Sequence, residues 1–259
     1  MPLSLTEELA ERLRNAGASR TPCDSLTSNH PDLSVEDAYA IQGINLDRRI
    51  ADGARLVGRK IGLTSRAIQE WLGVAEPDFG GLLSTMSVPN CGTAPIDELL
   101  QPRVEGELAF VLKRSLSGPG ITAAEVIAAT DLLLPAIEII DSRIKDWKFT
   151  IQDTIADNAS SGMFVVGSQP MSLNQIDMKT IGLTLRKNGE VVSTGAGAAC
   201  LADPVNAVVW LANKLGELGT EIEAGQVILS GALGPVTPVV PGDYVTVQIG
   251  RMGEVGVRF

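Results

Sequence analysis

The pattern of apolar and polar positions divides the chain into a helical beginning and a β-rich remainder. Residues 4–16 are predicted to form a first helix. A second helix is predicted to begin after Ser34, which can cap it together with Asp37 at the third helical position, and to run to about Ile50. We therefore expect residues 1–55 to form an N-terminal helical segment.

Strand-like segments dominate the chain after residue 55. Residues 181–194 give the clearest signal, because two runs typical of strands meet at Asn188-Gly189, a dipeptide typical of β-hairpins. Further strands are expected at residues 56–63, 162–167, 226–230, 243–249 and 253–258. Residues 80–100 are rich in Gly, Ser, Pro and Asn, so they are expected to form loops with short strands.

Two helices are predicted within this β-rich part. Thr122 and Glu125 have the spacing of a capping box, which predicts a short helix after them. Asp203 can cap a longer helix that has Pro204 at its first position and ends near Gly219. The apolar positions of this second helix recur with helical spacing.

The order of these elements predicts an α+β protein with one β-rich domain. Helices and strands do not alternate regularly along the chain, so a doubly wound sheet is not expected. We expect residues 56–259 to form the β-rich catalytic domain behind the helical segment 1–55. A length of 259 residues with 44% hydrophobic residues is sufficient for one large core.

Composition and charge exclude several classes of function. The formal net charge of -10 argues against binding of nucleic acid. No apolar run is long enough to span a bilayer, and the N-terminus shows no secretory signal. The three isolated cysteines, Cys23, Cys91 and Cys200, indicate a reducing compartment, so a cytoplasmic location is expected. His30 is the single histidine, so acid–base chemistry must depend on Lys, Asp, Glu, Tyr or metal-bound water.

Three glutamates in two apolar stretches are the strongest candidates for chemistry. Glu105 and Glu107 are two residues apart in a predicted strand, so their side chains point to the same face. Glu138 is flanked by isoleucines in a run typical of a buried strand. Buried carboxylates are costly unless they are paired or bind a metal, and three together would suit a hard cation such as Mg²⁺ or Mn²⁺. The alternative is three glutamates that form separate salt bridges at strand edges.

Three further polar residues lie in segments that could carry chemistry. Lys60 lies between apolar residues and glycines, which favours partial burial and a role in proton transfer. The alternative is a lysine whose head group reaches solvent. Asp78 is surrounded by turn residues, where aspartates usually bond to their own backbone. Ser160 belongs to the small polar stretch 157–162, which either forms an Asx-type turn or contacts a bound acid.

Six short motifs occur in order along nearly the whole chain. They are Lys60-Ile61-Gly62-Leu63-Thr64-Ser65, Pro77-Asp78-Phe79-Gly80, Glu105-Gly106-Glu107, Glu138-Ile139-Ile140-Asp141-Ser142-Arg143, Ala156-Asp157-Asn158-Ala159-Ser160 and Gly195-Ala196-Gly197-Ala198-Ala199. With this set the chain resembles the 2-keto-4-pentenoate hydratases, a family within the fumarylacetoacetate hydrolase superfamily.

The resemblance implies a fold, a metal and an assembly. The implied fold is a mixed β-roll like that of the fumarylacetoacetate hydrolases, with an N-terminal helical segment. The implied metal is Mg²⁺ or Mn²⁺, bound by Glu105, Glu107 and Glu138. Members of the family form homo-oligomers, often pentamers or decamers, so a homo-oligomer is expected. The family also implies a complex with a decarboxylase or aldolase of the same pathway.

The implied reaction is the addition of water to 2-hydroxypenta-2,4-dienoate or a close homologue. The product is 4-hydroxy-2-oxopentanoate, and the reaction belongs to the meta-cleavage degradation of aromatic compounds. The substrate would thus be a small anionic 2-hydroxydienoate or 2-keto acid. Lys60 and Asp78 are the candidates for proton transfer. Ser160 is the candidate for orienting substrate or water, and Lys60, Ser160 and Ser230 are the candidates for substrate contact.

Two alternatives to the hydratase stay open. Decarboxylases of the same family remove CO₂ from 4-oxalocrotonate, and a chain of this family can also be a catalytically silent partner subunit. The motifs at residues 77–80, 101–107 and 160–164 look like the hydratase branch. Ala232 differs from the hydratase branch, in which a second serine stands at this position. The loss of this hydroxyl leaves the identity of the substrate undecided. Ala202-Asp203-Pro204 also differs from the sequence that the family usually has at this place, and we interpret the difference as a change of helix cap.

Overall fold

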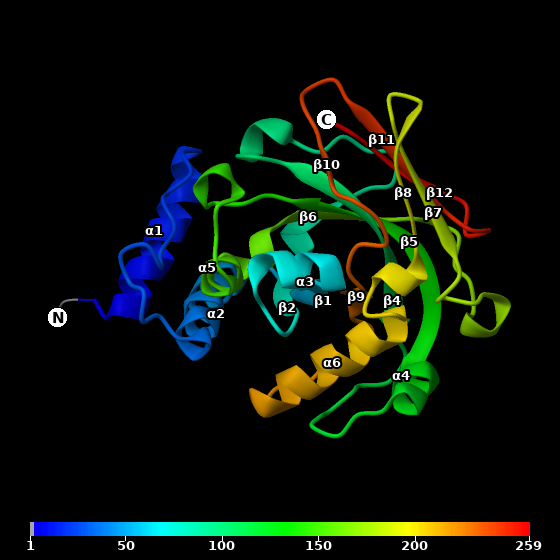
Figure 1. The fold of residues 1–259 in the computed structure, drawn as a ribbon, viewed down its shortest axis with the longest axis horizontal. Helices are drawn as coiled ribbons and strands as arrows, with labels where there is room; N and C mark the ends of the chain where they lie inside the picture. The colour runs from blue at the N-terminus through cyan, green and yellow to red at the C-terminus, as the bar shows by residue number, and fades with distance from the viewer. Residues whose placement is uncertain (1–2) are drawn as a thin grey trace.

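Two helices form the beginning of the chain (Figure 1). The computed structural model describes residues 3–259, apart from the side chain of Trp71. Helix α1 spans Leu5–Ser19 and helix α2 spans Val35–Ala51. Ser34 caps α2 through a capping box, as the sequence predicts. Both predicted N-terminal helices are thus confirmed.

A large mixed sheet forms the centre of the molecule. Its strands follow the order β2-β1-β9-β4-β5-β6-β3, and β10 pairs with β4. The pairs β1–β9 and β3–β6 are parallel, and the other pairs are antiparallel. The strands are β1 (Leu56–Gly62), β2 (Asp78–Leu83), β3 (Ser87–Val88), β4 (Arg103–Leu112), β5 (Thr130–Ile140), β6 (Ser161–Val166), β9 (Val227–Leu229) and β10 (Thr237–Pro238). Figure 1 shows that the long strand β5 is strongly curved.

A smaller antiparallel sheet has the order β12-β11-β7-β8. Its strands are β7 (Gly182–Lys187), β8 (Glu190–Ala196), β11 (Tyr244–Ile249) and β12 (Glu254–Arg258). Strands β7 and β8 are the hairpin predicted around Asn188-Gly189. Both turn residues have positive φ, 55° and 89°, which a two-residue hairpin turn of this kind requires. The two sheets and the helices outside them confirm the predicted α+β class.

The two sheets pack against each other through β4. A methyl group on Gly106 would lie 2.5 Å from Leu183 Cδ1 and 2.9 Å from Val247 Cγ1, both on the small sheet. A larger residue would therefore push the sheets apart. Side chains alternate along a strand, so Glu105 and Glu107 point to the opposite face of the large sheet.

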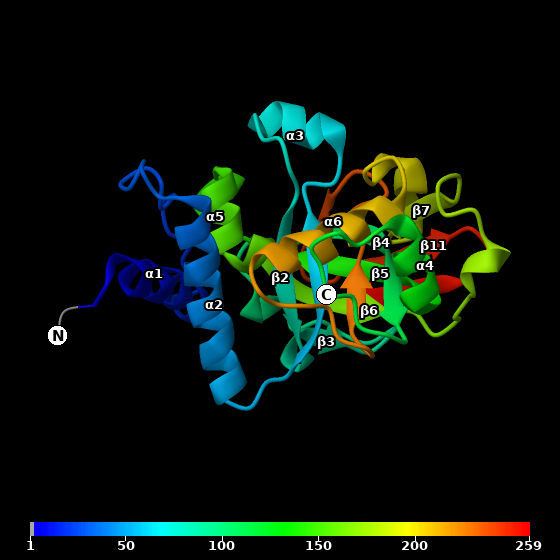
Figure 2. The same ribbon diagram turned by 90° about the horizontal axis from the view of Figure 1, so that it is seen from below.

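Four further helices surround the sheets. They are α3 (Arg66–Leu72), α4 (Ala123–Ala129), α5 (Ile151–Ala156) and α6 (Pro204–Glu217). Helices α4 and α6 confirm the predicted helices, with Thr122 and Asp203 as their caps. Helices α3 and α5 were not predicted, because six or seven residues are too few to show a clear helical period. Figure 2 shows α3 standing out from the body of the molecule. No helix in residues 3–259 is long and apolar enough to cross a membrane.

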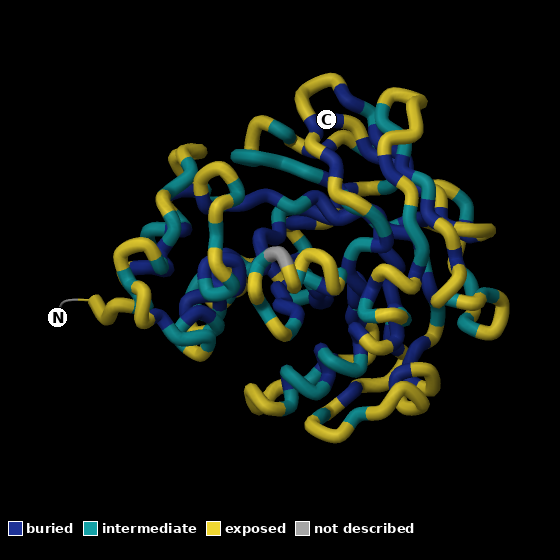
Figure 3. Tube along the Cα trace, in the orientation of Figure 1, coloured by how far each residue is buried: buried dark blue, intermediate teal, exposed yellow. Residues whose placement is uncertain are grey.

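One face of the large sheet carries an apolar cluster next to the predicted site. Ala109 lies two residues after Glu107 on β4, and its register partner on β9 is Leu229. Phe164 on β6 is the register partner of Glu138. Ala109, Leu229 and Phe164 belong to one buried cluster. Figure 3 shows many buried residues in the centre of the molecule, and this buried cluster lies beside Glu107 and Glu138 along their strands.

The N-terminal helices contact the rest of the chain through hydrogen bonds and apolar packing. The side-chain amide of Gln42 on α2 donates to the carbonyl oxygens of Phe79 at 2.9 Å and Ile155 at 2.8 Å. A separate buried cluster joins α1 and α2 to α5. The division into a segment 1–55 and a domain 56–259 stays a prediction.

Candidate active site

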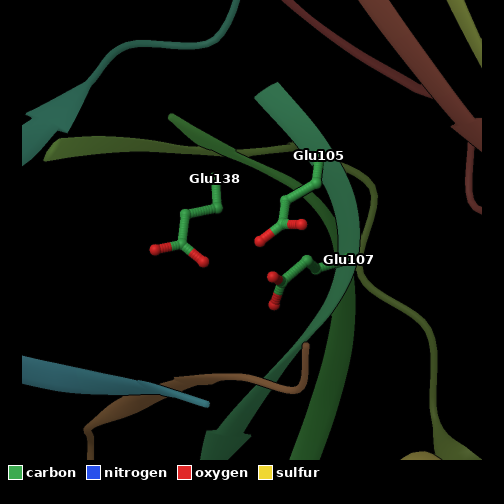
Figure 4. Close-up of side chains that lie close together, drawn as sticks. All are labelled: Glu105, Glu107 and Glu138. Carbon is green, nitrogen blue, oxygen red and sulfur yellow. The ribbon is translucent and has the colours of Figure 1, made fainter. Parts of the chain in front are cut away.

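Three glutamate carboxylates meet on one face of the large sheet (Figure 4). Glu105 on β4 is the register partner of Glu138 on β5, and Glu107 lies two residues further along β4. Register partners in neighbouring strands, and residues two apart in one strand, share a face of the sheet. Each residue offers a carboxylate oxygen, and these three oxygens lie within 4.8 Å of one another. The register of two adjacent strands therefore brings together the three residues that the sequence singled out.

Two oxygen atoms of this cluster have no hydrogen-bond partner among the described residues. They are Glu107 Oε1 and Glu138 Oε2, and both side chains are fully buried. The other Glu107 oxygen accepts from the N–H of Gly231 at 2.7 Å, and Glu138 Oε1 accepts from Ser161 Oγ at 3.4 Å. Buried polar atoms are nearly always satisfied, so the two free oxygens fit a site for a cation. Three carboxylates are ligands that a hard divalent cation prefers.

Burial raises the pKa values of all three glutamates, and repulsion from Glu138 adds to the rise at Glu105 and Glu107. Desolvation is the largest cause in each case. The pKa of Glu105 rises to about 7, and the charge of Glu138 is the second cause. The pKa of Glu107 rises well above its usual range, whereas Lys60 offsets part of the rise at Glu138. Without a cation, the cluster therefore retains protons to higher pH than separate glutamates would.

Lys60 is buried beside the cluster and forms a salt bridge with Glu138. Its Nζ lies 3.1 Å from Glu138 Oε1, and only 2% of the residue is exposed. The alternative of a lysine that reaches solvent is therefore wrong. Burial lowers the pKa of Lys60, but the nearby charges of Glu138 and Asp78 outweigh this effect and hold it above its usual value. Within residues 3–259 neither Glu105 nor Glu107 forms a salt bridge, so the alternative of three separate salt bridges is also wrong.

The Asp78 carboxylate and the Lys60 amine both lie close above Gly62, where the missing side chain of the glycine leaves room for them. A methyl group on Gly62 would lie 2.2 Å from Asp78 Oδ1 and 3.3 Å from Lys60 Nζ. Asp78 Oδ2 accepts from Thr154 Oγ1 at 3.0 Å, whereas Oδ1 has no hydrogen-bond partner in the described part of the chain. Burial raises the pKa of Asp78, and Lys60 offsets part of the rise. Asp78 thus begins strand β2 as a buried residue, which corrects the expectation of an ordinary turn aspartate.

A pocket of about 200 Å³ opens beside these groups. Its polar lining includes Lys60, Asp78, Arg103, Glu105, Thr154 and Ser160. Its apolar lining includes Ile68, Leu72, Ile140, Phe149 and Val236. The guanidinium of Arg103 lies over the ring of Trp147, 4.6 Å from its centroid. A lining that combines charged groups with apolar residues suits a small anion with a hydrocarbon part.

The turn between α5 and β6 forms another wall of the pocket. Three successive residues, Asn158, Ala159 and Ser160, have positive φ values of 57°, 50° and 51°. Residues other than glycine rarely adopt this conformation, and such strain is often found at functional sites. The Asn158 side chain accepts from the N–H of Gly81 at 2.7 Å and donates to its carbonyl at 3.0 Å. The turn is thereby held against β2, and Ala159 and Ser160 line the pocket.

An ion pair that the sequence analysis did not single out fixes this turn. Arg143 Nε donates to Asp157 Oδ1, and Arg143 Nη1 donates to the carbonyl of Ser161 at 3.0 Å. Ser160 Oγ donates to the other Asp157 oxygen at 3.2 Å. Because Ser161 also donates to Glu138, this ion pair positions both the pocket wall and the glutamate cluster. Both partners lie in quoted motifs, but no spacing in the sequence reveals their contact.

Ser230 does not line the pocket. It is fully buried, and its hydroxyl donates to the carbonyl of Gly231 at 3.3 Å. The carbonyl of Ser230 accepts from Cys200 Sγ at 2.9 Å, whereas Ala232 of the same segment does line the pocket. Since the Gly231 N–H donates to Glu107, this segment supports the glutamate cluster. A contact between Ser230 and the substrate stays a prediction.

Comparison with known proteins identifies the family. The model for the fumarylacetoacetate (FAA) hydrolase C-terminal region matches residues 72–259. The chain is 51% identical over 253 residues to the 2-keto-4-pentenoate hydratase of Paraburkholderia xenovorans strain LB400, and the match covers 98% of this chain and 94% of that one. The chain belongs to the 2-keto-4-pentenoate hydratase family. A second relative in this family, the 2-hydroxyhexa-2,4-dienoate hydratase of Comamonas testosteroni, is 44% identical over 98% of this chain and 97% of its own. The resemblance seen in the motifs is confirmed.

A solved structure of a related decarboxylase has nearly the same fold as this chain. The 4-oxalocrotonate decarboxylase from Pseudomonas putida G7, complexed with magnesium and adipate, matches with a TM-score of 0.95 and 40% sequence identity. The match covers 100% of this chain and 99% of that chain. The predicted fold of the fumarylacetoacetate hydrolase superfamily is therefore confirmed. Because a decarboxylase has the same fold, the fold alone does not separate the two branches of the family.

The substitution Glu107→Gln tests whether the three glutamates bind a metal ion. The amide keeps the shape of the side chain and its acceptor for the Gly231 N–H, so the fold should persist. Changes to groups that only support metal ligands reduce metal affinity by about 10- to 100-fold. Loss of a ligand itself should therefore weaken Mg²⁺ and Mn²⁺ binding by at least about 10²-fold. Isothermal titration calorimetry on metal-free protein measures this, with Glu254→Gln on the surface as control. Equal affinity in both variants would exclude Glu107 as a ligand.

The pH dependence of stability provides a second test. The folded pKa of Glu105 is about 7, against an ordinary value of 4.5, and those of Glu107 and Glu138 are also raised. Between these pH values the folded state binds more protons than the unfolded state, so the free energy of unfolding falls as pH rises. Metal-free protein should therefore lose thermal stability from about pH 5 to about pH 7, whereas saturating Mg²⁺ should reduce the loss. A melting temperature that rises across this range in metal-free protein would contradict the raised pKa values.

Proposed function

We propose that this protein hydrates 2-hydroxypenta-2,4-dienoate, or a close homologue, to 4-hydroxy-2-oxopentanoate. The observation that carries the proposal is the meeting of Glu105, Glu107 and Glu138 beside Lys60 at the end of a small pocket. The identity of 51% to a 2-keto-4-pentenoate hydratase supports this reaction above others that such a cluster could serve. The protein is accordingly a hydro-lyase, and its substrate is a small 2-hydroxydienoate or 2-keto acid.

The three glutamates are the proposed ligands of Mg²⁺ or Mn²⁺. The two oxygens without partners, one on Glu107 and one on Glu138, support this assignment, as does the magnesium complex of the related decarboxylase. Glu105 lines the pocket and is the ligand nearest the substrate, while Glu107 and Glu138 lie beneath it. A cation held there supplies Lewis acidity, which stabilises negative charge that develops on substrate oxygens.

The reaction requires proton transfers that Lys60 and Asp78 are placed to perform. A proton leaves the 2-hydroxyl and one is added to C5, which gives a 2-keto-3-enoate. Water oxygen then bonds to C4 while a proton is added to C3, so the product contains the atoms of substrate plus water. Lys60 Nζ and the unpartnered Asp78 Oδ1 lie close to each other above Gly62, and both residues line the pocket. Both groups can therefore exchange protons with one bound molecule.

Ser160 is proposed to orient the substrate or the water. Its hydroxyl is fixed by Asp157 at 3.2 Å, and the residue lines the pocket. The strained turn that holds Ser160 is costly, which supports a positioning role. The apolar residues Ile140, Phe149 and Val236 suit the hydrocarbon part of the diene, and they exclude water from the remainder of the pocket.

Decarboxylation of 4-oxalocrotonate is the second candidate, because two observations favour it. The related decarboxylase binds the dicarboxylate adipate, and it matches this chain with a TM-score of 0.95. Arg103 also places a cation in the lining of the pocket, where it could pair with a second carboxylate. Asp78 counters this effect, since its carboxylate lies in the same lining and would repel a second carboxylate.

A homo-oligomer is also proposed. Val191 and Val192 on the edge strand β8 are 53% and 42% exposed, and the nearby Val240 is 57% exposed. Exposed apolar residues on an edge strand are typical of surfaces that pair with another chain. Multi-angle light scattering should give a mass of several chains, and replacing Val191 by Lys should lower that mass. A monomer at micromolar concentration would contradict the proposal.

The substitution Lys60→Met tests proton transfer. Methionine fills similar space without charge, so the fold should persist, and turnover should fall by roughly 10²-fold or more, the usual scale for a general acid–base group. Steady-state kinetics at saturating Mg²⁺ measure this, and metal titration verifies that the variant still binds the cation. Lys113→Met changes an exposed lysine and serves as the control. Near-normal turnover in a folded Lys60→Met protein would assign Lys60 a structural role.

A direct comparison of two substrates tests whether the protein is a hydratase or a decarboxylase. The freshly prepared dienol and 4-oxalocrotonate are offered at equal concentration with Mg²⁺, and absorbance and CO₂ release are followed. We expect hydration of the dienol to be the faster reaction, because Asp78 disfavours a second carboxylate. Faster release of CO₂ would assign the chain to the decarboxylases, while no reaction with either substrate would favour a silent partner subunit.

A further inference from the structure

A second pocket lies behind the turn that lines the first one. It has a volume of about 410 Å³ and lies between helices α1 and α2 and the turn before β6. Figure 1 shows these two helices at one end of the molecule, with α5 beside them. The two pockets share no lining residue. The second pocket is therefore separate from the glutamate cluster.

Four arginines line this second pocket, which we call the arginine pocket. They are Arg14, Arg48, Arg49 and Arg143. Two aspartates, Asp52 and Asp157, also line it, but Asp157 is already bonded to Arg143 and Ser160. Positive charge thus gathers in one cavity, although the chain as a whole has a formal net charge of -10.

Two of these four arginines, Arg48 and Arg49, lack an anionic partner among the described residues, and both are exposed. Within residues 3–259 neither Arg48 nor Arg49 forms a salt bridge, and Arg49 Nη2 donates to the Thr85 hydroxyl at 2.9 Å. Arg14 Nη2 lies 3.3 Å from Glu11, but its Nη1 is buried without a hydrogen-bond partner in the described part of the chain. Partial burial lowers the pKa of Arg49, and the charge of Arg143 lowers it further. A bound anion would relieve this repulsion and satisfy the free donors.

Stabilisation of helix ends accounts for only part of this cluster. Arg48 and Arg49 lie in the last turn of α2, where positive charge is favourable. Arg14 lies inside α1, and Arg143 belongs to the segment after β5, so neither serves the end of α2. The dipole of α2 therefore does not explain why Arg14 and Arg143 lie at the same cavity as Arg48 and Arg49.

The arginine pocket is connected to the active site through the turn between α5 and β6. Asp157, Asn158 and Ser161 line the arginine pocket, whereas Ala159 and Ser160 line the first pocket. An anion that contacts Arg143 would compete with Asp157 for its guanidinium. Such competition would alter the ion pair that positions Ser160 and, through Ser161, Glu138.

We propose that the arginine pocket binds a small oxyanion, either a phosphate or a dicarboxylate, and that the bound anion changes substrate affinity through this turn. Guanidinium groups form paired hydrogen bonds with both kinds of oxyanion. The cavity of about 410 Å³ has room for either.

Calorimetric titration tests the binding site directly. Full-length protein is freed of metal with a chelator and dialysed, so that no anion binds through a metal at the glutamates. Inorganic phosphate and succinate are then titrated separately, with sodium chloride holding the ionic strength constant. We expect saturable binding of one anion per chain, and the tighter of the two identifies the preferred group.

Matched variants locate the site. The double variant Arg48→Gln/Arg49→Gln should bind the anion at least about 10-fold more weakly, since it loses two charge-assisted partners. Arg14→Gln serves as a second variant on a different helix, and the exposed Arg251→Gln should bind like the wild type. Absence of saturable binding in the wild type, or equal binding by all variants, would overturn the proposal.

A kinetic measurement tests the connection between the pockets, and this part rests on the proposed hydratase function. KM for the dienol is measured at saturating Mg²⁺ with and without the tighter anion. KM should change by about 5-fold or more in the wild type, a typical scale for coupled sites. It should change little in the double variant, which also controls for binding of the anion to Mg²⁺. Equal KM values in the wild type would overturn the coupling, while the calorimetry decides the site independently of activity.

Discussion

Repulsion among three carboxylates, two of them fully buried and one at the pocket wall, is the constraint on which the rest of the site depends. The oxygens of Glu105, Glu107 and Glu138 lie within 4.8 Å of one another on a packed sheet face. Such charges do not persist together in a protein interior without protons or cations. Lys60 offsets one of the three charges, and a divalent cation would balance the remaining two. Asp78, with one free oxygen and a raised pKa, is then left available to exchange a proton.

The fold creates this constraint through two backbone features. Antiparallel register places Glu105 opposite Glu138, while Gly106 lets the second sheet pack closely behind the same strand. The strained turn before β6 closes the site from the other side, and the Arg143–Asp157 ion pair holds it. Because this ion pair also borders the arginine pocket, the same turn can respond to a charge bound outside the active site.

The sequence predicted much of this molecule because its signals were local. Capping boxes at Ser34 and Thr122 and the Asn188-Gly189 turn are short-range features, and each predicted element is present. The face shared by Glu105 and Glu107 follows from the period of a strand. The Arg143–Asp157 contact was not predictable in this way, because it joins two loops whose distance depends on the packing of β5 against β6. Helix α3 was missed because it is too short to show a period and has no side-chain cap, whereas α5 begins with a capping box, Thr150 and Asp153, that could have revealed it.

The central claim is that the three glutamates together bind one divalent cation. Crystals of the full-length protein soaked in Mn²⁺ allow the ion to be located by anomalous diffraction at the manganese absorption edge. The account predicts one anomalous peak per chain, with an oxygen of each of Glu105, Glu107 and Glu138 at about 2.0–2.3 Å, a typical range for small hard cations. The account would be contradicted by a peak elsewhere, or by well-ordered glutamate side chains with no anomalous peak between them at saturating Mn²⁺.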